Sequence, residues 1–186
     1  MTTEEFEALI EGAEESPSLE FKGPMSWSQS TFVKDILALS NVVDGGWLII
    51  GIEDDTYERV GVTDDQIATF VPDTMRDQIA NFADPSVRFS RFVVTGADEK
   101  RFVVIRVHPF DQDPVICKKE KYDVHAGKLY YRSNVGKPQS AEVSNSTDMR
   151  AIVEAAIARR LHALQQVGII APPPQDNAMD EELGGL

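Results

Sequence analysis

The stretch LSNVVDGGWLIIGIEDD, residues 39–55, decides the fold prediction. It starts as the last turns of an apolar segment with helical spacing and reaches a turn at Asp44-Gly45-Gly46. An apolar run at 47–52 follows, and three acids at 53–55 end it. Glycine commonly follows the last turn of a helix, and a short apolar run between turn residues is typical of a buried strand. The stretch therefore predicts a helix capped by glycine, a turn and a strand inside a core.

The segments on either side alternate between helical and extended patterns. Helical spacing covers 3–13, the segment before residue 44, a region after Thr63 that Pro72 interrupts, and 148–166. Extended patterns cover 18–22, 60–62, the hairpin 87–94 and 101–107, and the candidates 114–118 and 128–132. This order predicts an α+β fold with a mixed, mainly antiparallel sheet and flanking helices.

The length and the composition indicate one domain followed by a tail. The 186 residues suit a single domain, which we place at residues 1–170. From residue 171 onward, a proline triplet and an acidic finish lack apolar residues to bury, so we expect a disordered acidic tail over 171–186. The acidic start does not resemble a secretory signal, and no apolar run is long enough to cross a bilayer. We therefore expect a cytoplasmic location and no membrane partner.

The charge is strongly negative but unevenly distributed. Six acids in residues 1–15 and four in residues 171–186 leave a formal charge of −3 for the middle of the chain, out of −13 in total. Between residues 115 and 137 the balance reverses, with six basic residues and only Glu120 and Asp123 against them. Lysine and arginine neutralise phosphates, so this stretch predicts a local basic surface. An edge strand that lysines protect against aggregation explains the same stretch equally well.

Other classes of site find little support. One cysteine and three scattered histidines give no spacing of the zinc-binding kind. Gly45-Gly46 precedes a strand and lacks the following Lys-Ser/Thr of a phosphate loop, so we expect no nucleotide cofactor.

Two blocks of sequence, ESPSLEFK at 15–22 and the stretch at 39–55, together resemble the AlbA-type domain of Schlafen proteins. In that family a segment like ES..LEFK precedes a helix that ends near an Asn, then GG, an apolar strand and GVDD or GVED. The segment LYYRSNVGKP at 129–138 resembles the family's late YYR strand and the loop after it. The resemblance covers roughly residues 10–145. It implies a nucleic-acid-binding domain, with a fold like that of Schlafen AlbA domains.

The resemblance also implies a candidate active site. In RNA-cleaving Schlafen members three acids form a metal-supported site, and the matching positions here are Glu15, Glu20 and Asp54. Carboxylates that hold Mg²⁺ or Mn²⁺ can polarise a phosphodiester. The chain would then be a divalent-metal-dependent endoribonuclease, with tRNA-like RNA as the favoured substrate. Alternatively, Glu15 is a solvated acid, Glu20 pairs with Lys22 or Lys34, and Asp54 only terminates a strand.

The expected contacts to RNA or DNA come from the basic stretch and its aromatic neighbour: Lys118, Lys119, Lys121, Tyr131, Arg132 and Lys137. A second hypothesis is a protein-interaction or self-assembly module that uses the acidic ends and the C-terminal helix. Schlafen cores contain two related lobes, and two copies of this chain would supply an equivalent pair, so we also predict a homodimer. The candidate interface is the apolar stripe of the last helix, although such a stripe usually packs against its own domain.

Overall fold

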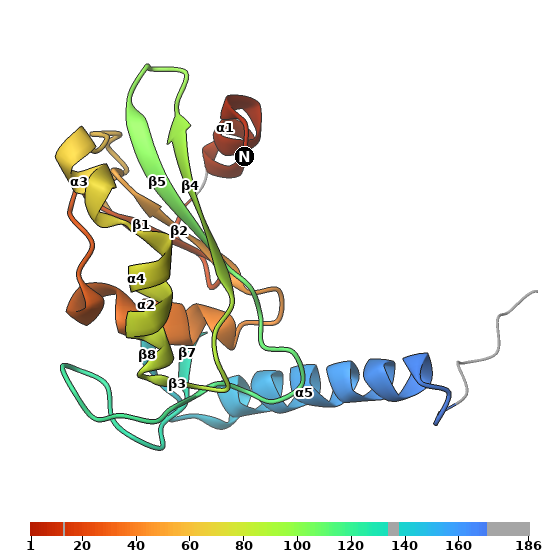
Figure 1. Cartoon of the computed structure of the whole chain (residues 1–186). Helices are drawn as coiled ribbons and strands as arrows, with labels where there is room; N and C mark the ends of the chain where they lie inside the picture. The colour runs from red at the N-terminus through yellow and green to blue at the C-terminus, as the bar shows by residue number, and fades with distance from the viewer. Residues whose placement is uncertain (13, 134–137, 171–186) are drawn as a thin grey trace, which may run out of the picture.

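The computed structural model of the chain describes residues 1–12, 14–133 and 138–170. The predicted tail at 171–186 and the predicted phosphate contact Lys137 lie outside the described residues. The elements in chain order are α1 (Thr3–Ile10), β1 (Leu19–Lys22), α2 (Gln29–Ser40), β2 (Gly46–Ile50), α3 (Asp64–Thr69), α4 (Pro72–Ala80), β3 (Ala83–Asp84), β4 (Phe89–Thr95), β5 (Arg101–Val107), β6 (Ile116–Cys117), β7 (Tyr130–Ser133), β8 (Gln139–Glu142) and α5 (Ser146–Gln166) (Figure 1).

A four-stranded sheet in the order β1-β2-β5-β4 forms the centre of the domain. β1 and β2 are parallel, whereas β2 and β4 both run antiparallel to β5. The pairs β3-β6 and β7-β8 form two further small antiparallel sheets. The predicted α+β class with a mixed, mainly antiparallel sheet is confirmed.

The two faces of the central sheet pack against different helices. Alternating residues of β2 and β5, such as Leu48 and Val103, join the larger core with α2. Their neighbours, such as Ile49 and Val104, join a smaller core that α1 covers through Phe6. This alternation follows from the two-residue period of a strand. Figure 1 shows the consequence, with α1 beside the β4-β5 hairpin and α2 across the opposite face.

The turn after α2 differs from the prediction at its start. α2 ends at Ser40 with Asn41 as its C-cap, so glycine does not cap this helix. Gly45 instead has a φ of +68°, and a Cβ there would lie 2.3 Å from the carbonyl oxygen of Val107. The glycine pair is required because the chain passes very close to neighbouring backbone as it enters β2.

The last helix, α5, does not bury its apolar stripe as an amphipathic helix usually does. Only Ile152 and Ala155 of its apolar residues are buried. The side of α5 that carries Met149, Val153, Ile157 and Leu161 is exposed, and Ile157 is 53% exposed. In Figure 1 the C-terminal half of α5 extends away from the rest of the domain. The alternative in which the whole stripe packs against its own sheet is therefore wrong.

Two smaller differences concern strands. Residues 60–62 form no regular strand, although Ile52 and Arg59 form an isolated bridge and the backbone amide of Val62 donates to the oxygen of Arg101 at 2.8 Å. β8, which the sequence did not predict, pairs with β7 in register Arg132 to Ser140. No helix in the described part of the chain is long and apolar enough to cross a membrane.

Candidate functional site

β1 is an edge strand of the central sheet, and its two faces differ in chemistry. Leu19 and Phe21 point into the smaller core beneath α1, so the alternation of the strand directs Glu20 and Lys22 to the side of α2. The Lys22 ammonium lies 3.3 Å from a carboxylate oxygen of Asp35 on α2. β7 also packs on α2. The polar face of β1 is consequently enclosed by α2 and β7.

A polar cavity of about 400 Å³ opens at this place. The three acids that the sequence selects all line it, although they are up to 39 residues apart in the chain. Its lining comprises Glu15, Glu20, Lys22, Ser30, Thr31, Lys34, Asp35, Asp54, Asp123, Pro138, Gln139 and Ser140. The structure thus brings the predicted acids to one cavity. We call it the acidic cavity.

Within the cavity, Glu20 is already paired with two cations. Its carboxylate accepts from the Lys22 ammonium at 2.5 Å and forms an ion pair with the Arg132 guanidinium. Glu20 is only 6% exposed. The suggestion that Glu20 pairs with Lys22 is therefore confirmed, and Arg132 is its second partner.

Arg132 occupies a different place from the one that the sequence predicted. Its side chain is 0% exposed, and besides Glu20 it donates to the backbone oxygens of Ser16 and Leu19 at 3.1–3.2 Å. Burial lowers the pKa of Arg132 to about 10, and the nearby charge of Glu15 acts in the opposite direction. Arg132 holds β7 against the start of β1. Its expected role as a surface contact to phosphate is wrong for this arrangement, because no part of the side chain reaches solvent.

The other two acids are partly exposed. A carboxylate oxygen of Glu15 accepts from the backbone amide of Phe21 at 3.3 Å, and Asp54 lies in the turn after β2. Among the described residues, no three or more His, Cys, Asp or Glu side chains are arranged to hold a metal ion. As arranged here, with Glu20 engaged by two cations, the three carboxylates do not fit a metal-ligand set.

Sequence reasoning named Lys22 and Lys34 only as alternative partners of Glu20, and it assigned neither Asp35 nor Asp123 to the cavity. Lys22 stands two positions after Glu20. Because side chains of a strand alternate between its faces, this spacing predicts that Lys22 and Glu20 lie on the same face. Lys34 and Asp35 had no comparable signal, because only the packing of α2 brings them to β1. Asp123 forms an ion pair with Lys34 across 89 residues of sequence.

The segment from Lys118 to Val124 follows β6 and reaches the rim of this cavity. Lys118, Lys119 and Lys121 are exposed, as the sequence predicts for a basic surface. Asp123 belongs to the same segment and lines the acidic cavity. Asp123 is therefore the residue that connects this segment with the cavity of the candidate acids. We call residues 118–124 the lysine segment.

The remaining predicted contact, Tyr131, is less accessible. It is half-buried and packs against the larger core, and burial raises the pKa of its hydroxyl. The ring of Tyr131 therefore packs mainly in the core and offers little surface to a nucleic acid.

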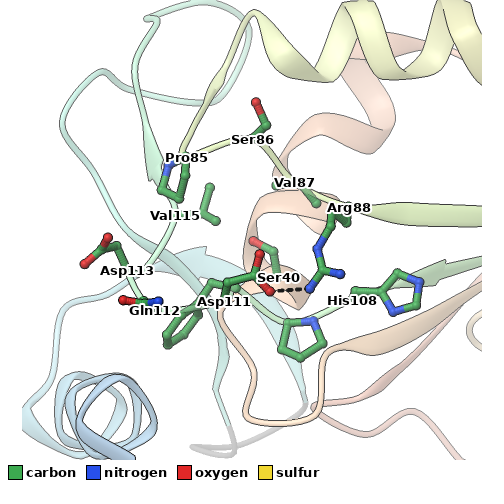
Figure 2. A pocket seen from close by; sticks show the side chains of 12 residues that line it. Ser40, Pro85, Ser86, Val87, Arg88, His108, Asp111, Gln112, Asp113 and Val115 are labelled. Atoms are coloured by element: carbon green, nitrogen blue, oxygen red, sulfur yellow. Dashed lines mark hydrogen bonds and ion pairs between the residues drawn. The ribbon is translucent and has the colours of Figure 1, made fainter. Parts of the chain in front are cut away.

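A second cavity, of about 340 Å³, lies between the end of β5 and the segment after β3. Figure 2 shows the Arg88 guanidinium in contact with the carboxylate of Asp111, and His108 beside it. Burial lowers the pKa of His108, and the charges of Arg106 and Arg88 add to this effect. This cavity contains none of the predicted site residues. Its arginine is already paired with an acid, so it offers a phosphate less than the lysine segment does.

The fold and the cavity define an α+β domain whose polar site is built on an edge strand. Comparison with protein families gives a match to the Schlafen, AlbA_2 model over residues 15–140, which is more than half of the chain. The chain belongs to this Schlafen AlbA family, and this membership indicates a nucleic-acid-binding domain.

No curated protein matches the chain. Among solved structures, the chain is similar to the crystal structure of the DIP2311 protein from Corynebacterium diphtheriae, a structural genomics target, with 20% identity and a TM-score of 0.48. The match covers 75% of this chain and 24% of that chain, so this chain spans about a quarter of the other protein's length.

Proposed function

We propose that this domain binds a nucleic-acid strand along the lysine segment and past the mouth of the acidic cavity. The observation that carries the proposal is the position of Asp123, which lines the cavity and is also part of the lysine segment. A strand bound by the lysines would therefore pass beside Glu15 and Asp54.

The electrostatics of the lysine segment favour phosphate contacts. Within the described part of the chain, the ammonium groups of Lys118, Lys119 and Lys121 have no carboxylate within ion-pair distance, whereas Lys22 and Lys34 are both paired with acids. Free exposed cations neutralise phosphates and release counterions, and this term supplies most of the affinity of non-specific binding. The formal charge of −13 opposes binding at long range but is screened beyond about 8–10 Å at ordinary salt.

Binding is tested by fluorescence anisotropy with labelled tRNA, single-stranded RNA, single-stranded DNA and duplex DNA at low and moderate salt. We expect wild-type protein to bind at least one of these and Lys118→Ala with Lys119→Ala to weaken that binding. The matched control is Lys100→Ala with Arg101→Ala, which removes the same charge at the far end of the β4-β5 hairpin. Binding of no probe, or equal weakening in both double variants, would contradict the proposal.

A second candidate function is divalent-metal-dependent cleavage of RNA at Glu15, Glu20 and Asp54. The observation that favours it is the shared cavity of the three acids. Binding of Mg²⁺ or Mn²⁺ by all three would require Glu20 to leave Lys22 and Arg132, with which it is paired here. We therefore rank cleavage below binding.

Cleavage is tested by incubating labelled tRNA with wild-type protein and with Asp54→Ala, with Mn²⁺ and with EDTA. If the second candidate is right, wild-type protein produces Mn²⁺-dependent fragments and the variant produces none. Cleavage that EDTA leaves unchanged, or that survives in the variant, would rule out the acidic site as its source.

A further inference from the structure

The lysine segment ends in a tight turn that places an aromatic side chain in solvent. The backbone amide of Lys121 donates to the oxygen of Val124 at 3.1 Å, and the amide of Val124 donates back at 3.2 Å. Tyr122 and Asp123 are the two central residues of the turn. Tyr122 has a φ of +59°, and Asp123 is not among the residues with positive φ.

This backbone conformation is unusual for tyrosine. When a two-residue hairpin turn has a positive φ at its first central residue only, glycine is the residue that normally stands there. A bulky side chain in the left-handed region costs roughly 1–2 kcal/mol because its Cβ crowds the following carbonyl. Strained residues of this kind cluster at functional sites. The strain at Tyr122 therefore indicates that its ring has a function.

The ring is fixed in place although it is exposed. It is stacked on Phe82, with centroids 6.1 Å apart and an interplanar angle of 25°. Its hydroxyl donates to the side-chain oxygen of Gln29 at 3.2 Å. Tyr122 nevertheless remains 47% exposed. These contacts come from α2 and from the chain just before β3, so they hold the ring without burying it.

One cation lies over the Tyr122 ring, and a second lies over its stacking partner Phe82. The Lys121 ammonium lies 4.6 Å from the centroid of the Tyr122 ring, and the Lys119 ammonium lies 5.7 Å from that of Phe82. An aromatic platform flanked by lysines is the arrangement with which proteins bind single strands, where the base stacks on the ring and the cations follow the backbone. The bases of a duplex are already stacked and paired, so they do not offer a free face at such a platform.

We propose that Tyr122 stacks on an unpaired base and makes this domain selective for single-stranded nucleic acid or for unpaired loops. The inference rests on the proposed function and specifies its substrate class. Lys118, Lys119 and Lys121 contact the phosphates on either side of that base. Because Asp123 follows Tyr122 and lines the acidic cavity, the stacked base fixes which part of the strand lies over the cavity.

The decisive variant is Tyr122→Gly, which removes the ring and also suits the positive φ, so the turn is retained. Tyr122→Phe keeps the stacking surface and is the matched control. The probes are labelled single-stranded oligo(dT), oligo(U) and a blunt duplex DNA of equal length. We expect Tyr122→Gly to weaken binding of the single strands by about 5- to 150-fold, the loss typical for one stacked base, and to change duplex binding less than about twofold. Tyr122→Phe should bind like wild type.

A direct readout is photo-crosslinking with oligonucleotides that contain 5-iodouracil, followed by peptide mapping. We expect the crosslinked peptide to contain Tyr122. In the binding experiment, a loss of affinity of Tyr122→Gly for both oligo(dT) and oligo(U) would show that the protein recognises the base and not the sugar. Loss on oligo(U) alone would still support stacking and would assign the site to RNA.

Several results would overturn the inference. An unchanged affinity of Tyr122→Gly for single strands, or an equal loss for single strands and duplex, would do so while leaving nucleic-acid binding itself intact. A crosslink confined to another peptide would have the same meaning. If wild-type protein bound none of the probes, the proposed function would fail and this inference with it.

Discussion

Glu20 and Arg132 are the residues on which the acidic cavity depends most. Both are buried, and Arg132 reaches from β7 to the carboxylate of Glu20 and to two backbone oxygens near β1. Removing one member of a buried ion pair leaves the other charge without compensation, which is far more costly than the pair is worth. These residues therefore support the shape of the cavity, whatever chemistry takes place in it.

We predict that Glu20→Ala lowers the free energy of unfolding by about 3–5 kcal/mol. Urea denaturation followed by circular dichroism measures this change. Asp54→Ala is the control, because Asp54 is a partly exposed turn residue in the same cavity and should change stability by less than about 0.5 kcal/mol. A Glu20→Ala protein as stable as wild type would show that the Glu20–Arg132 pair is unimportant for the fold.

Asn41, the Asn at the end of the helix in the family-like block, is a second structural residue. Its side-chain amide donates to the backbone oxygens of Val115 and Tyr130 at 2.9 Å, and its oxygen accepts from the amide of Val115 at 2.8 Å. Asn41 is 0% exposed. Its hydrogen bonds join the end of α2 to β7 and to the chain that leads into β6 and the lysine segment.

For Asn41→Ala we expect a loss of roughly 2–3 kcal/mol in stability, because buried backbone groups lose their partners. Thermal and urea unfolding of Asn41→Ala and Asn81→Ala should be compared. Asn81 is exposed and its amide makes one local bond to the oxygen of Asp77, so its replacement should have a small effect. Similar losses in both variants would contradict the role given to Asn41.

Among the helices and strands, the sequence predicted best those elements whose ends are set by residues next to them in the chain. The β4-β5 hairpin and the helical region after Thr63 formed as predicted, because turn and cap residues lie next to the segments they define. Residues 60–62 and β8 were mispredicted because their pairing depends on partners that local patterns do not reveal. The acids of the cavity came from the family resemblance, whereas Lys34, Asp35 and Asp123 join it only through tertiary packing.

Besides its apolar face, helix α1 is attached through an ion pair between Glu7 and Arg59. Arg59 donates to both carboxylate oxygens of Glu7, at 2.8 and 2.9 Å, and to Asp98 at 2.8 Å. The pKa of Glu7 lies below its ordinary value of 4.5, first because of the hydrogen bond from Arg59 and then because of the amide of Ala97. The ionised form of Glu7 therefore stabilises the attachment.

Because the folded pKa of Glu7 is depressed, its contribution is present above about pH 4.5 and is lost as the pH falls through the depressed value. We predict that hydrogen-exchange protection of residues 3–10 decreases selectively on acidification. Glu7→Gln should show the reduced protection already at neutral pH, whereas Glu4→Gln on the same helix should behave like wild type. Equal protection of α1 in all three proteins at neutral pH would show that this contact does not hold the helix.

At the scale of the whole molecule, the exposed side of α5 bears on the oligomeric state. The side chains of the stripe Met149, Val153, Ile157 and Leu161 are 41–53% exposed. A homodimer through this stripe is our prediction, since two-fold dimers are the commonest soluble oligomers.

Light scattering at micromolar concentration should give twice the chain mass of 20.6 kDa. Ile157→Glu, at a position that is 53% exposed, should give the monomer mass with the fold retained. Ala158→Glu adds the same charge at an exposed position outside the stripe and should remain a dimer. A wild-type mass near 20.6 kDa would contradict dimerisation, and a dimer in both variants would place the interface elsewhere.

The distribution of charge over the molecule leads to the most direct test of nucleic-acid binding by the lysine segment. The measurement is the dependence of the binding constant for single-stranded oligonucleotide on salt concentration, in wild type and in Lys118→Ala with Lys119→Ala. Each phosphate contact on a single strand contributes about 0.7 to the slope of log K against log salt, so the double variant should show a slope shallower by about 1.4. Lys100→Ala with Arg101→Ala should keep the wild-type slope. A double lysine variant with the slope and the affinity of wild type would contradict the assignment of the binding surface.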